Sequence, residues 1–238
     1  KMFLSLRVSM GFKGKWMLIK LINMGAKVYG ISKDKFSEKD ISINKKLKKK
    51  NFFYFNLVNS KKTQKIINNI RPDIIIHMAA QSLVRKSYLD PFTTFNDNLI
   101  STLNILQSSI NQNSIKSIFI TTTDKCYENF NLKNKRYREN DKLGGNDPYS
   151  ASKAACEIMI NSYLKSFLIK KNIGLVSARA GNVIGGGDWS DDRLIPDIIR
   201  SVQEGKKLII RYPNATRPST LESDKPFKSD PFEKYPLI

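Results

Sequence analysis

Short apolar runs alternate along the chain with longer segments of helical period, and this alternation constrains the fold most. The runs are rich in isoleucine, valine and phenylalanine, and they predict strands over residues 3–6, 26–31, 51–58, 73–80, 115–124 and 173–180. The segments between them predict helices over residues 13–25, 61–70, 91–112 and 147–171. Strands separated by helices assemble into a parallel sheet with helices on both faces. The sequence therefore predicts a doubly wound parallel α/β sheet.

Composition narrows the class of protein. The 238 residues are 40% hydrophobic, too many for a disordered chain. Lysine and arginine total 41 against 21 acidic residues, a net charge of +20, which raises the question of nucleic acid. However, 31 of these bases are lysine and 10 are arginine, whereas proteins that read base edges rely on arginine. We expect no nucleic-acid partner, and a basic nucleic-acid-binding protein stays as the weaker alternative.

Two cysteines, Cys126 and Cys156, and one histidine, His77, are the only residues of their types. They are too few for a disulfide framework or a zinc site, so we expect both thiols to be reduced and no bound metal. The chain also shows no signal-peptide pattern and no apolar run of about 20 residues. The expected location is the cytoplasm, without membrane contact.

Ligands of open α/β sheets bind beyond the carboxyl ends of the strands, so the residues there are the candidates. Gly11 and Gly14 lie between a predicted strand and a helix, where a backbone without side chains can approach a pyrophosphate. Ala79 and Ala80 follow the strand at 73–80 and leave room for a flat cofactor, or simply pack against a neighbour. Neither feature alone is specific.

A stronger signal combines a threonine-rich strand end, TTTDKCY at 121–127, with Tyr149-Ser-Ala-Ser-Lys153. Residues four apart share one face of a helix, so the Lys153 ammonium can favour the Tyr149 phenolate. A phenol whose pKa falls from about 10 becomes a base for a sugar hydroxyl near neutral pH. The combination is much less likely to be accidental than either feature alone, and it predicts a catalytic base at this strand end.

These segments together resemble the extended short-chain dehydrogenase/reductases, of the NAD-dependent epimerase/dehydratase type, and among them the CDP-glucose 4,6-dehydratases. The matching stretches are GFKGKW, HMAAQSLVRKSY, TTTDKCYEN, YRENDKLGGNDPYSASKAACE, ARAGNVIGGGDWSDDRLIPDI and IIRYPNATRP. Asp124-Lys125 stands where relatives that act on dTDP-glucose or GDP-mannose carry Asp-Glu. The resemblance implies a Rossmann-type fold, bound NAD and a nucleotide-sugar substrate.

The resemblance also implies roles for individual residues. Tyr149, paired with Lys153, takes the proton of the sugar 4-hydroxyl with help from Thr123, Lys125 removes the C5 proton, and Asp124 protonates the departing 6-hydroxyl. The product is a 4-keto-6-deoxy sugar. Asn182, Arg193 and Arg217 are the implied substrate-binding residues. Besides Tyr149 and Lys153, the implied NAD-binding residues are Gly11, Phe12, Gly14, Asn56, Leu57, Ala79, Ala80, Gln81 and Asn98.

The chain departs from the family pattern at three places. Val8 stands at the first glycine of the nucleotide-binding turn, Asn56 replaces an aspartate, and the sequence diverges from Ser219 onward. We expect an NAD-binding domain over residues 1–180, a partial substrate region over 181–218 and an irregular tail over 219–238. The C-terminal substrate subdomain is then largely missing. An intact chain would form a homo-oligomer, and an inactive NAD-binding relative that acts through interaction is the second alternative.

Overall fold

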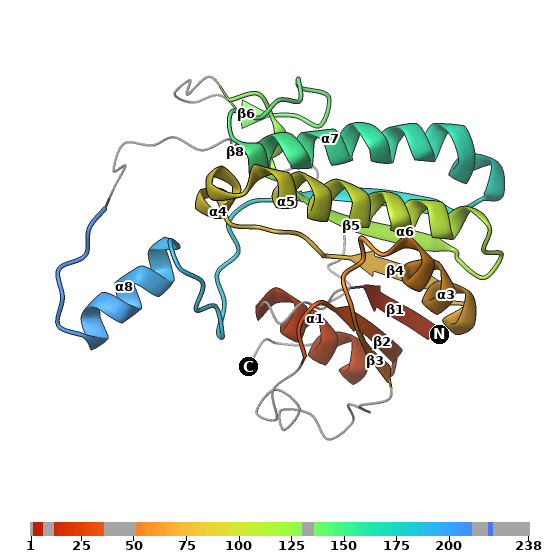
Figure 1. Ribbon diagram of the computed structural model, residues 1–238, viewed down its shortest axis with the longest axis horizontal. Helices are drawn as coiled ribbons and strands as arrows, with labels where there is room; N and C mark the ends of the chain where they lie inside the picture. Colours follow the sequence, from red (N-terminus) through yellow and green to blue (C-terminus); the bar gives the residue numbers. More distant parts are fainter. Residues whose placement is uncertain (1, 7–11, 36–50, 130–135, 211–218, 221–238) are drawn as a thin grey trace, which may run out of the picture.

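A six-stranded sheet forms the centre of the computed structural model, which describes residues 2–6, 12–35, 51–129, 136–210 and 219–220 (Figure 1). Its order is β3-β2-β1-β4-β5-β7, and every pair of neighbours is parallel. The direction of winding reverses between β1 and β4, where such sheets bind their ligands. The strands are β1 (Met2–Leu6), β2 (Lys27–Ser32), β3 (Phe52–Tyr54), β4 (Ile74–His77), β5 (Ser117–Thr123) and β7 (Gly174–Ala180).

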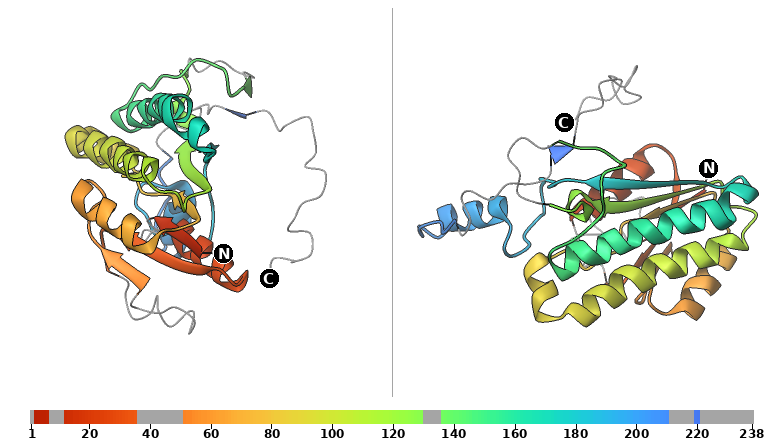
Figure 2. Two further views of the ribbon diagram at one scale, coloured as in Figure 1. Left: turned by 90° about the vertical axis from the view of Figure 1, so that its right-hand side faces the viewer. Right: turned by 90° about the horizontal axis from the view of Figure 1, so that it is seen from above.

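Helices cover both faces of the sheet, as the views of Figure 2 show. α1 (Phe12–Asn23) packs on one face through Leu18 and Leu21. α3 (Ser60–Ile70), α6 (Ser101–Ile110) and α7 (Pro148–Tyr163) pack on the other. Successive side chains of a strand point to opposite faces of the sheet. In β4, Ile76 therefore packs in the core beneath α1, and Ile75 packs in the core beneath α3, α6 and α7. The prediction of a doubly wound α/β sheet is confirmed.

The remaining elements are short. α4 (Val84–Leu89) and α5 (Pro91–Phe95) precede a π-helical segment, η2 (Asn96–Ile100), that continues into α6. A 3-10 turn, η3 (Asp124–Cys126), follows β5, and η4 (Leu164–Leu168) and η5 (Ile169–Lys171) follow α7. α8 (Leu194–Gln203) lies after a long loop, and β6 (Arg136–Tyr137) pairs with β8 (Ser219–Thr220). None of the helices in these ranges is long and apolar enough to cross a membrane.

Two expected elements differ from the structure. The strand predicted over 51–58 is β3 alone, because the Asn56 side chain accepts a hydrogen bond from the Val58 amide at 3.2 Å and turns the chain out of the sheet. The tail expected to be irregular from residue 219 begins instead with paired backbone, since β8 hydrogen-bonds with β6. Val8, Gly11 and Arg217 lie outside the described residues.

Candidate active site

The end of β5 brings together the predicted catalytic residues of the TTTDK stretch. Thr123 is buried, and its hydroxyl donates to Asp124 Oδ1 at 3.1 Å. The Thr123 hydroxyl oxygen also accepts from the Lys125 backbone amide at 3.4 Å, which closes the η3 turn. A Cβ built at Gly181, just past β7, would lie 3.7 Å from Asp124 Oδ2. The Asp124 carboxylate therefore lies between the ends of two neighbouring strands.

Tyr149 enters the site from the first turn of α7. Asp147 caps this helix, since its Oδ1 accepts from the Ser150 amide at 2.9 Å, and Pro148 begins it. Gly145 lies against this turn so closely that a Cβ there would be 2.3 Å from the Ala151 nitrogen. Only glycine fits at that position. Capping and close packing thus place the buried Tyr149 side chain beside Thr123.

The electrostatics of Tyr149 differ from the expectation. Burial raises its pKa above the ordinary value, and Asp124 adds to this increase. A hydrogen bond with Thr123 and the charge of Arg193 act in the opposite direction. Lys153 Nζ donates to the Thr121 carbonyl at 3.2 Å. The predicted fall in the pKa of Tyr149 is therefore wrong for the protein alone, because removing the phenol from water favours its neutral form.

Two of the predicted cofactor-binding residues, Gln81 and Asn98, are joined by two hydrogen bonds. The Gln81 backbone N–H donates to Asn98 Oδ1 at 2.8 Å. Asn98 Nδ2 donates to the Gln81 backbone carbonyl at 3.2 Å and to Ser152 Oγ at 2.8 Å. Asn98 is fully buried within the π-helical segment. It ties the residues after β4 to α7, beside the buried Ala79.

Asn56 and Leu57 lie together after β3. Asn56 Nδ2 donates to Asp97 Oδ1 at 2.9 Å, and Leu57 is a core residue. Asp97 also lies 3.8 Å from the Lys33 ammonium, which follows β2. Asp97 therefore provides a carboxylate near the ends of β2 and β3, next to Asn56, which stands where we expect the family pattern to carry an aspartate.

α1 contributes three residues near the first turn. Phe12 and Gly14 are buried at its start, and the Arg193 guanidinium lies 6.0 Å from the Phe12 ring centre. Burial lowers the pKa of Lys13, and the nearby charges of Arg193 and Lys153 lower it further. Lys13 of α1 is thus near Lys153 of α7 and Arg193 at the start of α8, with Asp188 as a single counter-charge. The excess of positive charge favours an anionic ligand.

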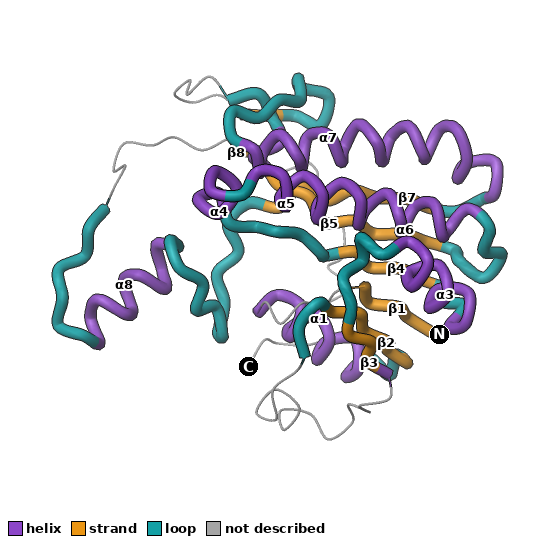
Figure 3. Tube along the Cα trace, in the orientation of Figure 1, coloured by secondary structure: helices purple, strands orange, loops and turns teal. Residues whose placement is uncertain are grey.

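A loop over residues 181–193 carries the predicted substrate-binding residues Asn182 and Arg193. It runs from the end of β7 to α8 (Figure 3). Trp16 Nε1 of α1 donates to the Gly186 carbonyl at 3.0 Å, and Arg193 forms an ion pair with Asp188 at 2.8 Å. Asn182 is exposed. The loop is thus held against α1, which brings Arg193 to the carboxyl ends of the strands.

These residues fit a dinucleotide. The Ser32 hydroxyl is buried at the carboxyl end of β2 and has no hydrogen-bond partner among the described residues. This strand end is where doubly wound folds hold a ribose. Sequence reasoning missed Ser32, Lys13, Asp97 and Trp16, since single polar or aromatic residues carry no motif. The described residues contain no group of three or more metal-ligating side chains.

A family model and several known proteins match most of this chain. A family model described as GDP-mannose 4,6 dehydratase matches residues 9–218. CDP-glucose 4,6-dehydratase of Salmonella typhimurium is 40% identical over 216 residues, which cover 87% of this chain and 59% of the relative. dTDP-D-glucose 4,6-dehydratase of Dictyostelium discoideum is 30% identical over 69% of this chain and 39% of that protein. The chain therefore spans well under two thirds of the length of these relatives.

Solved structures show the same fold. The UDP-glucose 4-epimerase of Thermus thermophilus, crystallised with NAD, has a TM-score of 0.69 and 25% identity over 81% of this chain and 59% of that one. The dTDP-glucose 4,6-dehydratase of Bacillus anthracis, also in complex with NAD, has a TM-score of 0.72 and 21% identity over 87% of this chain and 63% of that one. With the family model matching most of its length, this chain belongs to the nucleotide-sugar 4,6-dehydratase family.

Proposed function

We propose that this protein uses NAD to dehydrate a nucleotide sugar, CDP-glucose, to its 4-keto-6-deoxy form. The observation that carries this proposal is the convergence of Thr123, Asp124 and Tyr149 at the end of β5, with Lys125 in the same turn. A simple reductase on this fold needs only the tyrosine and its neighbours. An acid and a base beside them suit an elimination as well.

The first step removes a proton from the sugar 4-hydroxyl. Tyr149 accepts this proton, and its hydrogen bond with Thr123 stabilises the phenolate that accepts it. Bound NAD would supply the hydride chemistry, as acceptor of the C4 hydride and donor of the same hydride to C6. Lys153 adds positive charge at the same helix face and lowers the cost of the phenolate.

The second step eliminates water between C5 and C6. Lys125 removes the C5 proton, which the neighbouring ketone makes acidic, and the C5 electron pair forms the double bond. Asp124, in its protonated form, gives a proton to the departing 6-hydroxyl as the C6–O bond breaks and water leaves. The proton on Lys125 returns to C5 when C6 receives the hydride. A carboxyl between the ends of β5 and β7 and a base one residue later can serve the two ends of this elimination.

The choice of CDP-glucose is supported by the 40% identity with the Salmonella enzyme and by Asp124-Lys125. Arg193 supports a nucleotide diphosphate sugar whatever its base, because a guanidinium fork binds a diphosphate well.

The test is incubation of the purified chain with CDP-glucose and NAD, followed by the absorbance of the 4-keto sugar in alkali. We expect turnover, and Tyr149→Phe should reduce it by about 10²–10⁴ because the general base is lost. The matched control is Tyr163→Phe at the other end of α7, where the hydroxyl contacts Gln107 at 3.0 Å. This control should retain wild-type turnover.

Other results would favour the alternatives. An inactive NAD-binding relative would gain thermal stability from NAD and convert no CDP-glucose. Conversion of dTDP-glucose in preference to CDP-glucose would retain the reaction and overturn the substrate.

A further inference from the structure

One face of α7 meets three consecutive residues of β5. Tyr149, Lys153 and Glu157 are four residues apart and so share this face. Tyr149 hydrogen-bonds with Thr123, Lys153 Nζ donates to the Thr121 carbonyl, and the Thr122 hydroxyl donates to Glu157 Oε1. The two proposed catalytic residues and Glu157 therefore fix one helix to one strand end.

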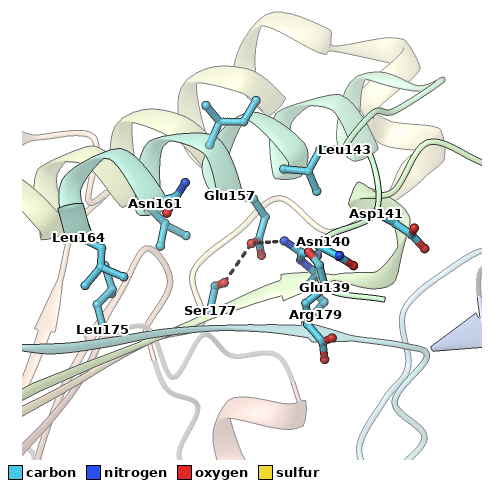
Figure 4. A pocket seen from close by; sticks show the side chains of 12 residues that line it. Glu139, Asn140, Asp141, Leu143, Glu157, Asn161, Leu164, Leu175, Ser177 and Arg179 are labelled. Atoms are coloured by element: carbon cyan, nitrogen blue, oxygen red, sulfur yellow. Dashed lines mark hydrogen bonds and ion pairs between the residues drawn. The ribbon is translucent and has the colours of Figure 1, made fainter. Parts of the chain in front are cut away.

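Glu157 is held by three side-chain donors. The residue is 5% exposed, and Oε2 accepts from Ser177 Oγ at 2.9 Å and from Arg179 at 3.0 Å (Figure 4). Thr122 is a third donor, on the other carboxylate oxygen. The carboxylate thus joins α7 to both β5 and β7. Removing one partner of such a buried ion pair leaves the other charge uncompensated and is strongly destabilising.

Arg179, the partner of Glu157, also contacts residues that follow the η3 turn. Its guanidinium donates to the Glu139 carbonyl at 2.8 Å and lies 4.8 Å from the centre of the Tyr127 ring. Tyr127 directly follows η3, the turn that contains Asp124 and Lys125. The Glu157–Arg179 pair is therefore in contact with residues on both sides of that turn.

We infer that Glu157 is a positioning residue, which holds α7 and the η3 turn in register so that Tyr149 and Lys125 face the same substrate. This inference deepens the proposed function and rests on it. Glu157 lies two helical turns, about 12 Å, from Tyr149 along α7 and does not reach the reacting atoms. It acts through Thr122 and Arg179.

The two cysteines report on this role without requiring turnover. Cys126 is a fully buried residue of η3, and Cys156 is fully buried in α7 with its thiol donating to the Asn98 carbonyl at 3.4 Å. In Glu157→Gln we expect alkylation of Cys126 by iodoacetamide to become at least about tenfold faster, because the turn opens locally. Cys156 should keep its wild-type rate. Peptide mass spectrometry distinguishes the two.

Ile160→Val is the matched control. Ile160 lies on the same helix and is buried, but it contributes packing and no polar link to β5. Its replacement should leave the ratio of the two alkylation rates unchanged. Equal acceleration at both thiols in Glu157→Gln, or an unchanged Cys126 rate, would show that Glu157 does not position the turn. If Glu157→Gln does not fold, Ser177→Ala removes one donor and should accelerate Cys126 selectively.

A cavity of about 510 Å³ beside Glu157 allows a second test. Figure 4 shows the Glu157 carboxylate at its wall with Ser177 and Arg179. In Glu157→Ala a small carboxylate can enter from this cavity and occupy the vacated position next to Arg179. Formate, but not chloride at equal ionic strength, should slow Cys126 alkylation towards the wild-type rate. Equal effects of the two salts would contradict the inference.

Turnover separates this inference from the proposed function. Where the wild-type chain converts CDP-glucose, Glu157→Gln should lower kcat by about tenfold or more and leave KM within about twofold, since the substrate contacts are intact. A rise in KM at unchanged kcat would overturn the positioning role. Absence of wild-type turnover would contradict the proposed function alone, and the thiol rates would still decide the role of Glu157.

Discussion

A single hydroxyl, that of Thr123, links the two halves of the proposed chemistry. It contacts Asp124 Oδ1 at 3.1 Å and also hydrogen-bonds with Tyr149. A threonine hydroxyl has one proton, so it can donate to the carboxylate or to the phenolate, but not to both at once. As Tyr149 ionises, donation to its oxygen gains strength and Asp124 loses a donor. The residues of oxidation and elimination are therefore coupled through one proton.

This division of roles predicts different effects of single replacements. Lys125→Ala should reduce water loss by about 10²–10⁴ while hydride still leaves C4, so NADH should accumulate in a single turnover. The absorbance of NADH measures this directly. Lys142→Ala, at an exposed lysine paired with Glu128 at 2.8 Å, is the control and should show no accumulation. Full dehydration by Lys125→Ala would exclude Lys125 as the C5 base.

Cys126 makes stability depend on alkaline pH. Burial raises the pKa of its thiol from 9.0 to about 12. The unfolded chain therefore loses this proton first, and the contribution to stability is present below pH 9 and is lost as the pH rises towards 12. The urea midpoint should fall between about pH 8 and pH 10.5, and less steeply for Cys126→Ala. An identical fall in the variant would show that other groups cause it.

At the scale of elements, the π-helical segment η2 is one of the parts that no local pattern predicted. The apolar spacing over residues 91–112 indicates a helix, and α5, η2 and α6 form one, but the extra residue in the π turn changes which side chains face inward. Asn98 thereby points to Gln81 and Ser152, which lie 17 and 54 residues away. Only the tertiary structure determines such a contact.

Asn98→Ala tests the importance of this segment. The replacement leaves the Gln81 backbone N–H buried without its acceptor, while the Ser152 hydroxyl keeps only its bond to the Tyr149 carbonyl. The free energy of unfolding should fall by about 1–3 kcal/mol. Urea denaturation measures the change. Asn113→Ala, at an exposed position beyond α6, should stay within about 0.5 kcal/mol of wild type. Equal stability of the two variants would mean that η2 does not hold the residues after β4.

The elements that could be predicted from sequence are those whose signal is local. Strands such as β4 and β5 are rich in apolar residues, and Asp147-Pro148 marks the start of α7, so their position follows from neighbouring residues. The Tyr149–Lys153 spacing likewise predicts one shared face. Glu157 was not predicted, because its partners Thr122, Ser177 and Arg179 come from two other strands. The pKa of Tyr149 also depends on burial, which spacing does not reveal.

At the scale of the whole molecule, the net charge of +20 attracts any anion, so binding of a polyanion does not by itself indicate function. The proposed ligand differs from nucleic acid in the number of its phosphates. A protein with 6–10 phosphate contacts loses about 10³–10⁵ in affinity between 50 and 200 mM salt. NAD carries a single diphosphate, so its binding depends far less on salt.

Salt dependence therefore separates the proposed function from its nucleic-acid alternative. We expect duplex DNA or RNA to bind at about 50 mM NaCl and to dissociate by about 200 mM, as non-specific complexes do. The increase in melting temperature caused by NAD should persist at the higher salt concentration, because a single diphosphate releases few counterions on binding. Thermal denaturation measures the NAD effect and fluorescence anisotropy measures nucleic-acid binding, each at the two salt concentrations. A nucleic-acid complex that survives about 200 mM salt in a protein that NAD does not stabilise would favour the alternative.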